Sequence, residues 1–186
     1  MNVFYLPDAR EGNVSFPEEE SKHIVRVLRM REGDTFCVTN GKGSLFDAEL
    51  IDAHPKRAMA NLLNRREGYD NRAFKLSIAI APTKLNERTE WFLEKATEIG
   101  IDEIKLFASY HSERRVVNVE RFKKIVVAAM KQSVKSNMPI VEEMQTFENL
   151  VRQDFSGQKF IAWIDEEVKD QLCNLYDKGS DVLVLI

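Results

Sequence analysis

The sequence predicts an α/β domain with a parallel sheet in residues 73–186, preceded by a small β-barrel in residues 1–68. Short segments rich in β-branched and aromatic residues surround one helical pattern in the first part, which is typical of a small barrel. Residues 67–72 are polar, contain a glycine and are typical of a linker. Beyond them, strand and helix patterns alternate, and this alternation predicts a parallel sheet.

The expected barrel is built from five short strands. Their segments, several of which are bounded by Pro, Gly or Asp, are Val3–Leu6, Asn13–Phe16, Thr35–Thr39, Ser44–Ile51 and Arg57–Leu63. The sequence Asn-Gly-Lys-Gly at residues 40–43 predicts a tight turn between the third and fourth strands, because Asn and Gly adopt positive φ angles easily.

One helix is expected within the barrel. Ser21 is a suitable N-cap, since its hydroxyl can accept a hydrogen bond from a free backbone N–H of the first turn. Ile24, Val27 and Leu28 recur at helical spacing and predict a buried apolar stripe. Gly33 is expected to end the segment.

The second domain is predicted to alternate four strands with four helices. The strands are expected at 75–81, 103–108, 159–164 and 181–186, and the helices at 88–99, 119–135, 146–153 and 167–177. Gly100 suits the end of the first of these helices, and Asn118 suits the N-cap of the second. Phe92, Ala96 and Ile99 are expected to form the buried stripe of the first helix.

Residues 81–100 hold the polar loop and the helix that follow the first predicted strand of the sheet. In open α/β sheets, ligands bind at the carboxyl ends of the strands, so this loop predicts a working edge. The last strand, 181–186, ends the sequence on five apolar residues. Chains usually end on polar surface residues, so we expect the sequence to be incomplete at its C-terminus. The alternative is a true terminal strand in the centre of the sheet.

Composition limits the class of protein. No apolar run is long enough to span a bilayer, and the N-terminus lacks the features of a secretory signal. The two cysteines, Cys37 and Cys173, lie far apart and are expected to be reduced and buried in a cytoplasmic protein. The histidines and cysteines show no metal-ligand spacing, and the eight glycines form no phosphate loop.

Basic residues are concentrated in two parts of the chain although the net charge is only −3. Residues 105–135 contain eight Lys or Arg and two Glu, and residues 21–31 contain four basic residues and no acid. Such patches can bind a polyanion locally, although they can equally be solvated helix faces. From the residues alone the chain is an α/β protein with basic patches and no identifiable reaction.

Three blocks of sequence together resemble the bacterial ribosomal RNA small subunit methyltransferase E family. The blocks are His23–Asp34, with its Val-Leu-Arg; Lys84 with Glu94–Ile104 and Ser112–Val117; and Ala128–Lys135 with Pro139. The resemblance rests on the order of these blocks over both domains. It implies a PUA-like RNA-binding barrel and a SPOUT-like α/β domain that is knotted in the family. Lys131 and Lys135 depart from the family, which often has Glu and Arg at these positions.

The resemblance implies an S-adenosylmethionine-dependent enzyme that methylates N3 of a uridine in 16S ribosomal RNA, and it implies a homodimer without a metal. The family's glycine-rich GPEGG loop would begin just after Ile186 and would complete the methyl-donor pocket. We therefore expect the 186 residues alone not to catalyse the reaction. A non-catalytic RNA-binding module with a degenerate α/β domain, and a small-molecule enzyme unrelated to RNA, are the alternatives.

Residue roles follow from matching this sequence to the family pattern. Arg114, which follows a strand at the predicted working edge, is expected to be the catalytic cation that stabilises negative charge on the target ring. The expected RNA-binding residues are Lys22, His23, Arg26, Arg29, Lys84, Gln132 and Lys135. The residues expected to border the donor are Trp163, Ile164, Asp165 and Ile186. Solvated helix faces, a structural histidine and a dimer contact are the alternatives for members of the RNA-binding group.

Overall fold

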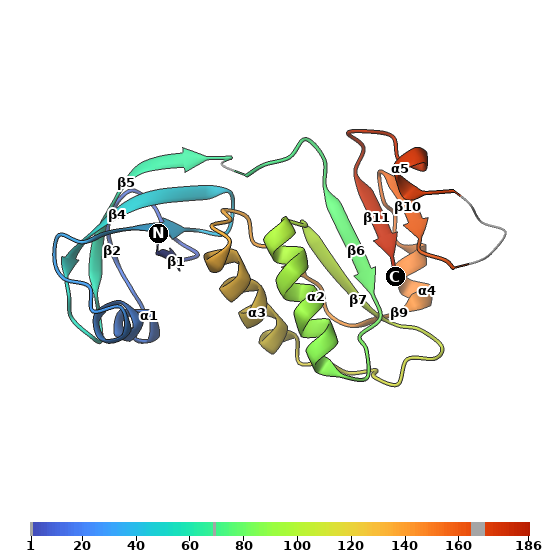
Figure 1. The fold of residues 1–186 in the computed structure, drawn as a ribbon, viewed down its shortest axis with the longest axis horizontal. Helices are drawn as coiled ribbons and strands as arrows, with labels where there is room; N and C mark the ends of the chain where they lie inside the picture. Colours follow the sequence, from blue (N-terminus) through green and yellow to red (C-terminus); the bar gives the residue numbers. More distant parts are fainter. Residues whose placement is uncertain (1, 69, 165–169) are drawn as a thin grey trace. The chain divides into compact units, whose positions relative to one another are not determined.

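The computed structural model describes residues 2–68, 70–164 and 170–186, and the chain divides into two compact units (Figure 1). The first unit runs from the N-terminus to Asn71 and also includes Met130–Met138. The second unit consists of Arg72–Ala129 and Pro139–Ile186. No helix among the described residues is long and apolar enough to cross a membrane.

The first unit is built on a five-stranded sheet with the order β1-β3-β4-β5-β2. The strands are β1 (Val3–Tyr5), β2 (Gly12–Ser15), β3 (Thr35–Thr39), β4 (Ser44–Asp52) and β5 (Met59–Glu67). Strand β1 runs parallel to β3, and the other neighbours are antiparallel. The predicted turn is confirmed, because residues 40–43 join β3 to β4 and the Asn40 side chain accepts the N–H groups of Lys42 and Ser44.

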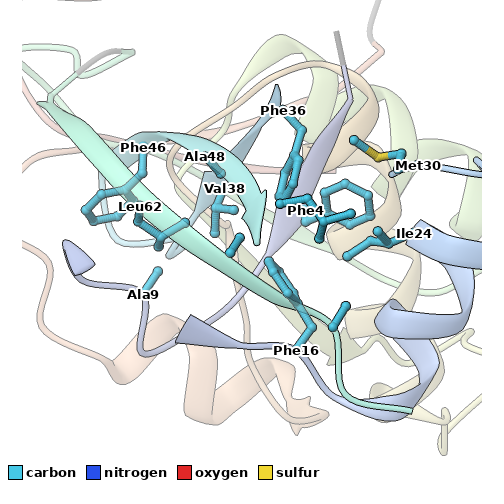
Figure 2. Close-up of a cluster of buried hydrophobic side chains, with 13 residues drawn as sticks. Phe4, Ala9, Phe16, Ile24, Met30, Phe36, Val38, Phe46, Ala48 and Leu62 are labelled. Carbon is cyan, nitrogen blue, oxygen red and sulfur yellow. The ribbon is translucent and has the colours of Figure 1, made fainter. Parts of the chain in front are cut away.

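The core of this unit is aromatic (Figure 2). Phe4 lies edge-on to Phe36, with ring centroids 5.0 Å apart, and also meets Phe16 at 5.9 Å. Such edge-to-face pairs add to the stabilisation that burial of the rings provides. Ile24 and Met30, from the segment that follows β2, also point into this cluster.

The prediction of Ser21 as a helix N-cap is wrong. Helix α1 (Glu18–Lys22) begins after Pro17, and its three glutamates lie in the first turn, where negative charge is favoured. Ser21 is fully buried inside the helix. Its hydroxyl donates to the carbonyl of Pro17 and accepts the N–H of Ala58, at 2.9 Å each. Ser21 therefore ties the helix to the chain before β5.

The predicted apolar stripe is also wrong at two of its three positions. Residues His23–Val27 form a π-helical segment, η1, in which the N–H of Leu28 donates to the carbonyl of His23 over 2.9 Å. The wider turn breaks the 3.6-residue period on which the prediction rested. Ile24 is fully buried, but the exposed fractions of Val27 and Leu28 are 68% and 36%. The helical segment also ends well before Gly33.

The second unit contains the predicted parallel sheet, in the order β10-β11-β6-β7-β8. The strands are β6 (Leu76–Ile80), β7 (Glu103–Ala108), β8 (Ile140–Val141), β10 (Gln158–Ile161) and β11 (Val182–Leu185), and a short β9 (Gln145–Thr146) pairs with the end of β7. Each pair of neighbouring strands in this order is parallel. Strand β11 lies inside the sheet between β10 and β6.

The helices of the second unit have the predicted order with different lengths. Helix α2 (Asn86–Ile99) ends at Gly100, whose φ of 97° is the left-handed conformation expected of a helix-ending glycine. Helix α3 (Val119–Gln132) begins after Asn118, whose side chain accepts the N–H of Arg121 at 2.9 Å. It is shorter than predicted, because Val134 takes a φ of 57° that a helix does not allow.

Three further expectations need correction. In α2, Ala96 is buried as expected, Phe92 is half-buried and Ile99 is 73% exposed. The other buried residues of this helix are Thr89, Leu93 and Thr97. Of the helix expected at 167–177, the described part is α5 (Leu172–Leu175), and residues 167–169 lie outside the described residues. Cys37 is buried as expected, but Cys173 is exposed. The remaining helix, α4 (Phe147–Arg152), packs on the sheet through Leu150.

Candidate active site

The carboxyl ends of four neighbouring parallel strands define one edge of the second unit. Strands β6, β7, β10 and β11 reach this edge at Ile80, Ala108, Ile161 and Leu185. Two hollows lie there, and the loops after β6 and β7 contribute residues to both. This edge is where open α/β sheets place their ligands, so the fold and the hollows agree on the position of a site.

The first hollow is an apolar cavity of about 450 Å³. Its lining residues are Ala81, Phe107, Ser109, Tyr110, His111, Phe147, Ile161, Ala162, Trp163, Leu185 and Ile186. Its size is typical of small-molecule sites. Four of the lining side chains are aromatic besides His111, so the cavity offers flat apolar surfaces to a planar ligand.

A tight turn carries the polar part of this lining. The N–H of Ser109 donates to Ser112 Oγ over 2.8 Å, and the two hydroxyls lie 2.9 Å apart. Between them, the rings of Tyr110 and His111 meet edge to face with centroids 4.9 Å apart. Sequence reasoning missed these residues, although their place directly after a predicted strand of the sheet was a usable signal.

The second hollow is a basic recess of about 380 Å³. It is lined by Lys84 from the loop after β6 and by Glu113, Arg114, Arg115 and Val116 from the loop after β7. Lys84 Nζ lies 2.9 Å from a carboxylate oxygen of Glu113, and Arg114 donates to the backbone carbonyl of Lys84 over 2.8 Å. The structure thus brings together two residues that the sequence predicted separately, Lys84 and Arg114.

The loop that carries Lys84 is fastened to the start of α2. The N–H of Thr83 donates to the buried Thr89 hydroxyl over 3.1 Å, and the Thr83 hydroxyl donates to the carbonyl of Leu85 over 2.7 Å. These bonds fix the backbone beside Lys84. The Lys84 carbonyl that accepts the hydrogen bond from Arg114 is therefore held in a defined position. The guanidinium of Arg114 has five N–H donors, and this bond accounts for one of them.

The residues expected to border a methyl donor lie in different settings. Ile186 lines the apolar cavity. The Ile164 side chain is fully exposed and does not belong to the lining, whereas its neighbours Ala162 and Trp163 do. Asp165 lies outside the described residues. Among the described residues, no group of three or more His, Cys, Asp or Glu could hold a metal ion.

The other expected RNA-binding residues belong to the first unit. Lys22 pairs with Glu18 over 2.7 Å, and the hydrogen bond and charge of Lys22 lower the pKa of Glu18. The ring of His23 lies edge-on to Phe4 at 6.0 Å. Arg26 and Arg29 are exposed on and just after η1.

Gln132 and Lys135 lie at the end of α3 and just beyond it, Gln132 exposed and Lys135 half-buried. Their neighbour Lys131 reaches Glu20 of α1 over 2.6 Å, and its ammonium lies 5.6 Å from the Phe4 ring centroid. Both members of the pair are largely buried. The positive charge at position 131 is therefore matched inside this chain by Glu20, and this pair explains how a lysine is accommodated there.

Comparison with known proteins is consistent with this geometry. A family described as "RNA methyltransferase domain" matches residues 70–186, and one described as "RNA methyltransferase PUA domain" matches residues 16–63. The chain is 25% identical to ribosomal RNA small subunit methyltransferase E of Bacillus subtilis, over 92% of this chain and 72% of that protein. It is 29% identical to the Synechocystis protein of the same name, over 92% of this chain and 56% of that protein.

Two solved structures share the fold. One, a probable rRNA-methyltransferase from Porphyromonas gingivalis, superposes with a TM-score of 0.89 at 38% identity, over 100% of this chain and 79% of that chain. The other is the ribosomal RNA small subunit methyltransferase E from Neisseria gonorrhoeae bound to S-adenosyl methionine. Its TM-score is 0.88 at 24% identity, over 100% of this chain and 78% of that chain, and it supports the fold alone.

Proposed function

The chain belongs to the ribosomal RNA small subunit methyltransferase E family, and from this membership we propose that it transfers a methyl group from S-adenosylmethionine to ribosomal RNA. The finer proposal is that the target is N3 of a uridine in 16S ribosomal RNA. We further propose residues 1–68 as an RNA-binding domain and residues 73–186 as the methyltransferase domain.

The observation that carries this proposal is the pairing of an apolar cavity with a basic recess at one sheet edge. The segment 109–116 contributes residues to both hollows. From the loop after β6, Ala81 lines the apolar cavity and Lys84 lines the basic recess. A methyltransferase for RNA needs one site with apolar surfaces for the flat adenine ring of its donor and an adjoining site for an anionic substrate. The two hollows supply surfaces of these two kinds.

The cavity residues suit S-adenosylmethionine. Tyr110, Trp163 and Phe147 offer ring faces and edges to an adenine base, and Ser109 places a hydroxyl in the same lining. Ile186 would border the donor from the end of β11. When bound, S-adenosylmethionine supplies an electrophilic methyl group. Ile164 and Asp165 stay in the proposal as residues near the donor.

The basic recess would hold the target nucleotide. Lys84 is an exposed point charge suited to a phosphate, and its bond to Glu113 is an exposed ion pair that costs little to exchange. Arg114 would donate to a uracil carbonyl oxygen, because loss of the N3 proton places negative charge on the ring oxygens. Its bond to the Lys84 carbonyl holds the guanidinium in position before substrate binds.

The target base must leave its stack before its N3 atom can reach the donor. Exposed cations of the first unit, including Lys22, Arg26 and Arg29, would add affinity through phosphates, with His23, Gln132 and Lys135 contributing further polar contacts. Because these groups lie on a unit with its own core, RNA affinity and methyl transfer are expected to be separable by mutation.

Methyl transfer is tested with the full-length protein, radiolabelled S-adenosylmethionine and small ribosomal subunits that lack the modification. We expect label in 16S ribosomal RNA and, after digestion to nucleosides, a product that co-elutes with 3-methyluridine. Label in a ribose-methylated or ring-carbon-methylated nucleoside would contradict the N3 proposal. RNA binding without any transfer would favour a non-catalytic RNA-binding module.

The proposed homodimer rests on the family resemblance and is tested separately. Sedimentation equilibrium of the purified protein at micromolar concentration is expected to give twice the chain mass of 21.5 kDa. A single-chain mass over the whole concentration range would contradict the dimer while leaving the methyltransferase proposal intact.

A further inference from the structure

The turn between Ile24 and Met30 is anchored in the core at both of its ends. Ile24 is fully buried, Met30 is 8% exposed, and both side chains point toward the aromatic cluster around Phe4 and Phe36 (Figure 2). The N–H of Met30 donates to the carbonyl of Ile24 over 3.1 Å and closes the turn. The segment between these anchors is thereby held at the surface in a defined conformation.

Four residues of this turn form what we call the η1 surface: Arg26, Val27, Leu28 and Arg29. Val27 and Leu28 are large apolar side chains that the core leaves exposed, and an arginine stands on either side of them in the sequence. A π-helical turn places these side chains outward, and such turns are frequent at functional sites. Folding of the barrel gives no reason for this arrangement, since Ile24 and Met30 already supply its apolar contacts.

The backbone at Arg29 gives an independent indication. Its φ of 55° lies in the left-handed region, where Cβ crowds the following carbonyl oxygen and glycine is favoured. Strained backbone of this kind clusters at sites where a side chain must be presented to a ligand. An arginine here, in place of the glycine that the backbone would accept most easily, points to a role for its guanidinium.

The charges near the η1 surface select the kind of partner. Of the acids that precede it, Glu18 and Glu20 are paired with Lys22 and Lys131. Of the acids that follow it, Glu32 is exposed next to Arg31, and Asp34 accepts the backbone N–H of Arg31 over 2.7 Å. Within the described part of the chain, neither Arg26 nor Arg29 has an ion-pair partner. Cations beside an apolar surface match a partner with regularly spaced negative charge and exposed flat apolar groups, which is the chemistry of a single-stranded nucleic acid.

We infer that the η1 surface binds single-stranded RNA, with Val27 and Leu28 in contact with unstacked bases and Arg26 and Arg29 on the flanking phosphates. Apolar side chains can insert beside or between bases in this way. The inference rests on the proposed function for its RNA substrate. It goes beyond that proposal by assigning base contacts to two apolar residues.

The first test separates base contacts from phosphate contacts. The double variant Val27→Ser, Leu28→Ser is compared with Leu63→Ser, a half-exposed leucine of β5 in the same unit. The probes are a twelve-nucleotide single-stranded RNA and inorganic polyphosphate. We expect the double variant to bind the RNA about tenfold more weakly, as for loss of base contacts. Its polyphosphate binding and its salt dependence should be unchanged, and Leu63→Ser should match the wild type.

The second test uses the strained backbone at position 29. Arg29→Gly removes the guanidinium and relieves the backbone, so the barrel should keep its melting temperature or gain a few degrees. RNA binding should weaken several-fold, with the slope of log affinity against log salt reduced by about 1. Asn64→Gly is the matched control, because Asn64 has a φ of 49° in the same unit and lies outside the η1 surface.

The outcomes distinguish this inference from the function on which it rests. Failure of the wild-type protein to bind RNA at all would overturn both. Wild-type RNA binding that the double variant and Arg29→Gly retain in full would overturn the inference alone. Retained RNA binding with a loss of self-association in sedimentation would also overturn it, and would assign the η1 surface to a contact between protein chains.

Discussion

The two units of this protein present their cations in different ways. On the η1 surface of the first unit, Arg26 and Arg29 extend into solvent, and neither has an ion-pair partner among the described residues. At the sheet edge of the second unit, Lys84 is paired with Glu113, and Arg114 is bonded to the Lys84 carbonyl. Solvated cations add affinity for a polyanion, whereas fixed cations can be aimed at one atom.

This difference matters because ordering a cation costs side-chain entropy. A solvated cation loses that entropy when it binds, whereas a fixed cation has lost it on folding. A solvated arginine loses side-chain entropy when it binds, and gains mainly from the release of counterions. A guanidinium that the fold already holds requires little reorganisation when charge develops beside it. The sheet edge should therefore control the rate of methyl transfer, and the η1 surface should control RNA affinity.

The largest expected effect is on the rate at the sheet edge. Arg114→Ala should lower single-turnover methyl transfer by about 10²–10³-fold, the usual loss when one donor to a developing anion is removed. RNA affinity should change less than about threefold, since exposed phosphate contacts elsewhere remain. Arg114→Lys is the control that keeps the charge and loses the fork geometry, and it should recover part of the rate. An equal loss of RNA affinity and rate would contradict the division between the two units.

The second unit also contains a buried cation, Lys105, whose role is structural. Lys105, in the middle of β7, is almost buried and lies 2.6 Å from Glu142 and 3.3 Å from Glu103. Burial by itself lowers its pKa, but the hydrogen bond to Glu142 and the charges of both glutamates outweigh burial and raise it. Removing the ammonium would leave two poorly solvated carboxylates side by side.

Lys105→Met should therefore lower the free energy of unfolding of the second unit by about 3 kcal/mol at neutral pH. Unfolding can be followed in urea by tryptophan fluorescence, because Trp91 and Trp163 both lie in this unit. Since the folded-state pKa of Lys105 is raised, its stabilisation is present below the unfolded lysine pKa and is lost as the pH rises through the folded one. The wild type should thus weaken at alkaline pH, and Lys105→Met should lack that loss and gain stability in acid as its glutamates protonate.

The class of each domain could be predicted because regular patterns carry it. Alternating strands and helices after residue 72 predicted the parallel sheet of the second unit, and the Asn-Gly turn at residues 40–43 predicted the β3–β4 hairpin of the first unit. Gly100 and Asn118 marked helix ends correctly, since local backbone chemistry decides such positions.

The failures occur where tertiary contacts override local patterns. Ser21 looked like a cap, but a buried bond to the Ala58 N–H keeps it inside the helix. Val27 and Leu28 had helical spacing, but a π turn changed the period and exposed them. At the site, the sequence could place Lys84 and Arg114 after neighbouring strands. It could not show that one backbone carbonyl joins them, because that contact spans 30 positions of the chain.

A smaller effect is expected from the carboxylate that neutralises Lys84. Glu113→Gln removes a negative charge from the basic recess, so RNA binding should strengthen about two- to threefold at low salt. Lys84→Gln should weaken it by a similar factor. In a double-mutant cycle measured by fluorescence anisotropy, the two effects should not add, because the charge of Glu113 acts mainly on Lys84. Additive effects would show that the ion pair does not govern access to Lys84.

The smallest expected effect is on the salt dependence of the first unit. Arg26→Ala should lower RNA affinity by less than about twofold at moderate salt and reduce the slope of log affinity against log salt by about 1, as for loss of one phosphate contact. Lys22→Ala is the matched comparison on the same segment, and its slope should change less because Glu18 already neutralises Lys22. The larger slope change is expected for Arg26→Ala because of counterion release. A lysine with a carboxylate partner in its own chain binds phosphate less readily than an arginine in solvent. If Lys22→Ala changed the slope as much as Arg26→Ala, the pairing of Lys22 with Glu18 would not persist in the complex. Solvated and paired cations would then contribute equally to RNA affinity, which would contradict the difference between the two units.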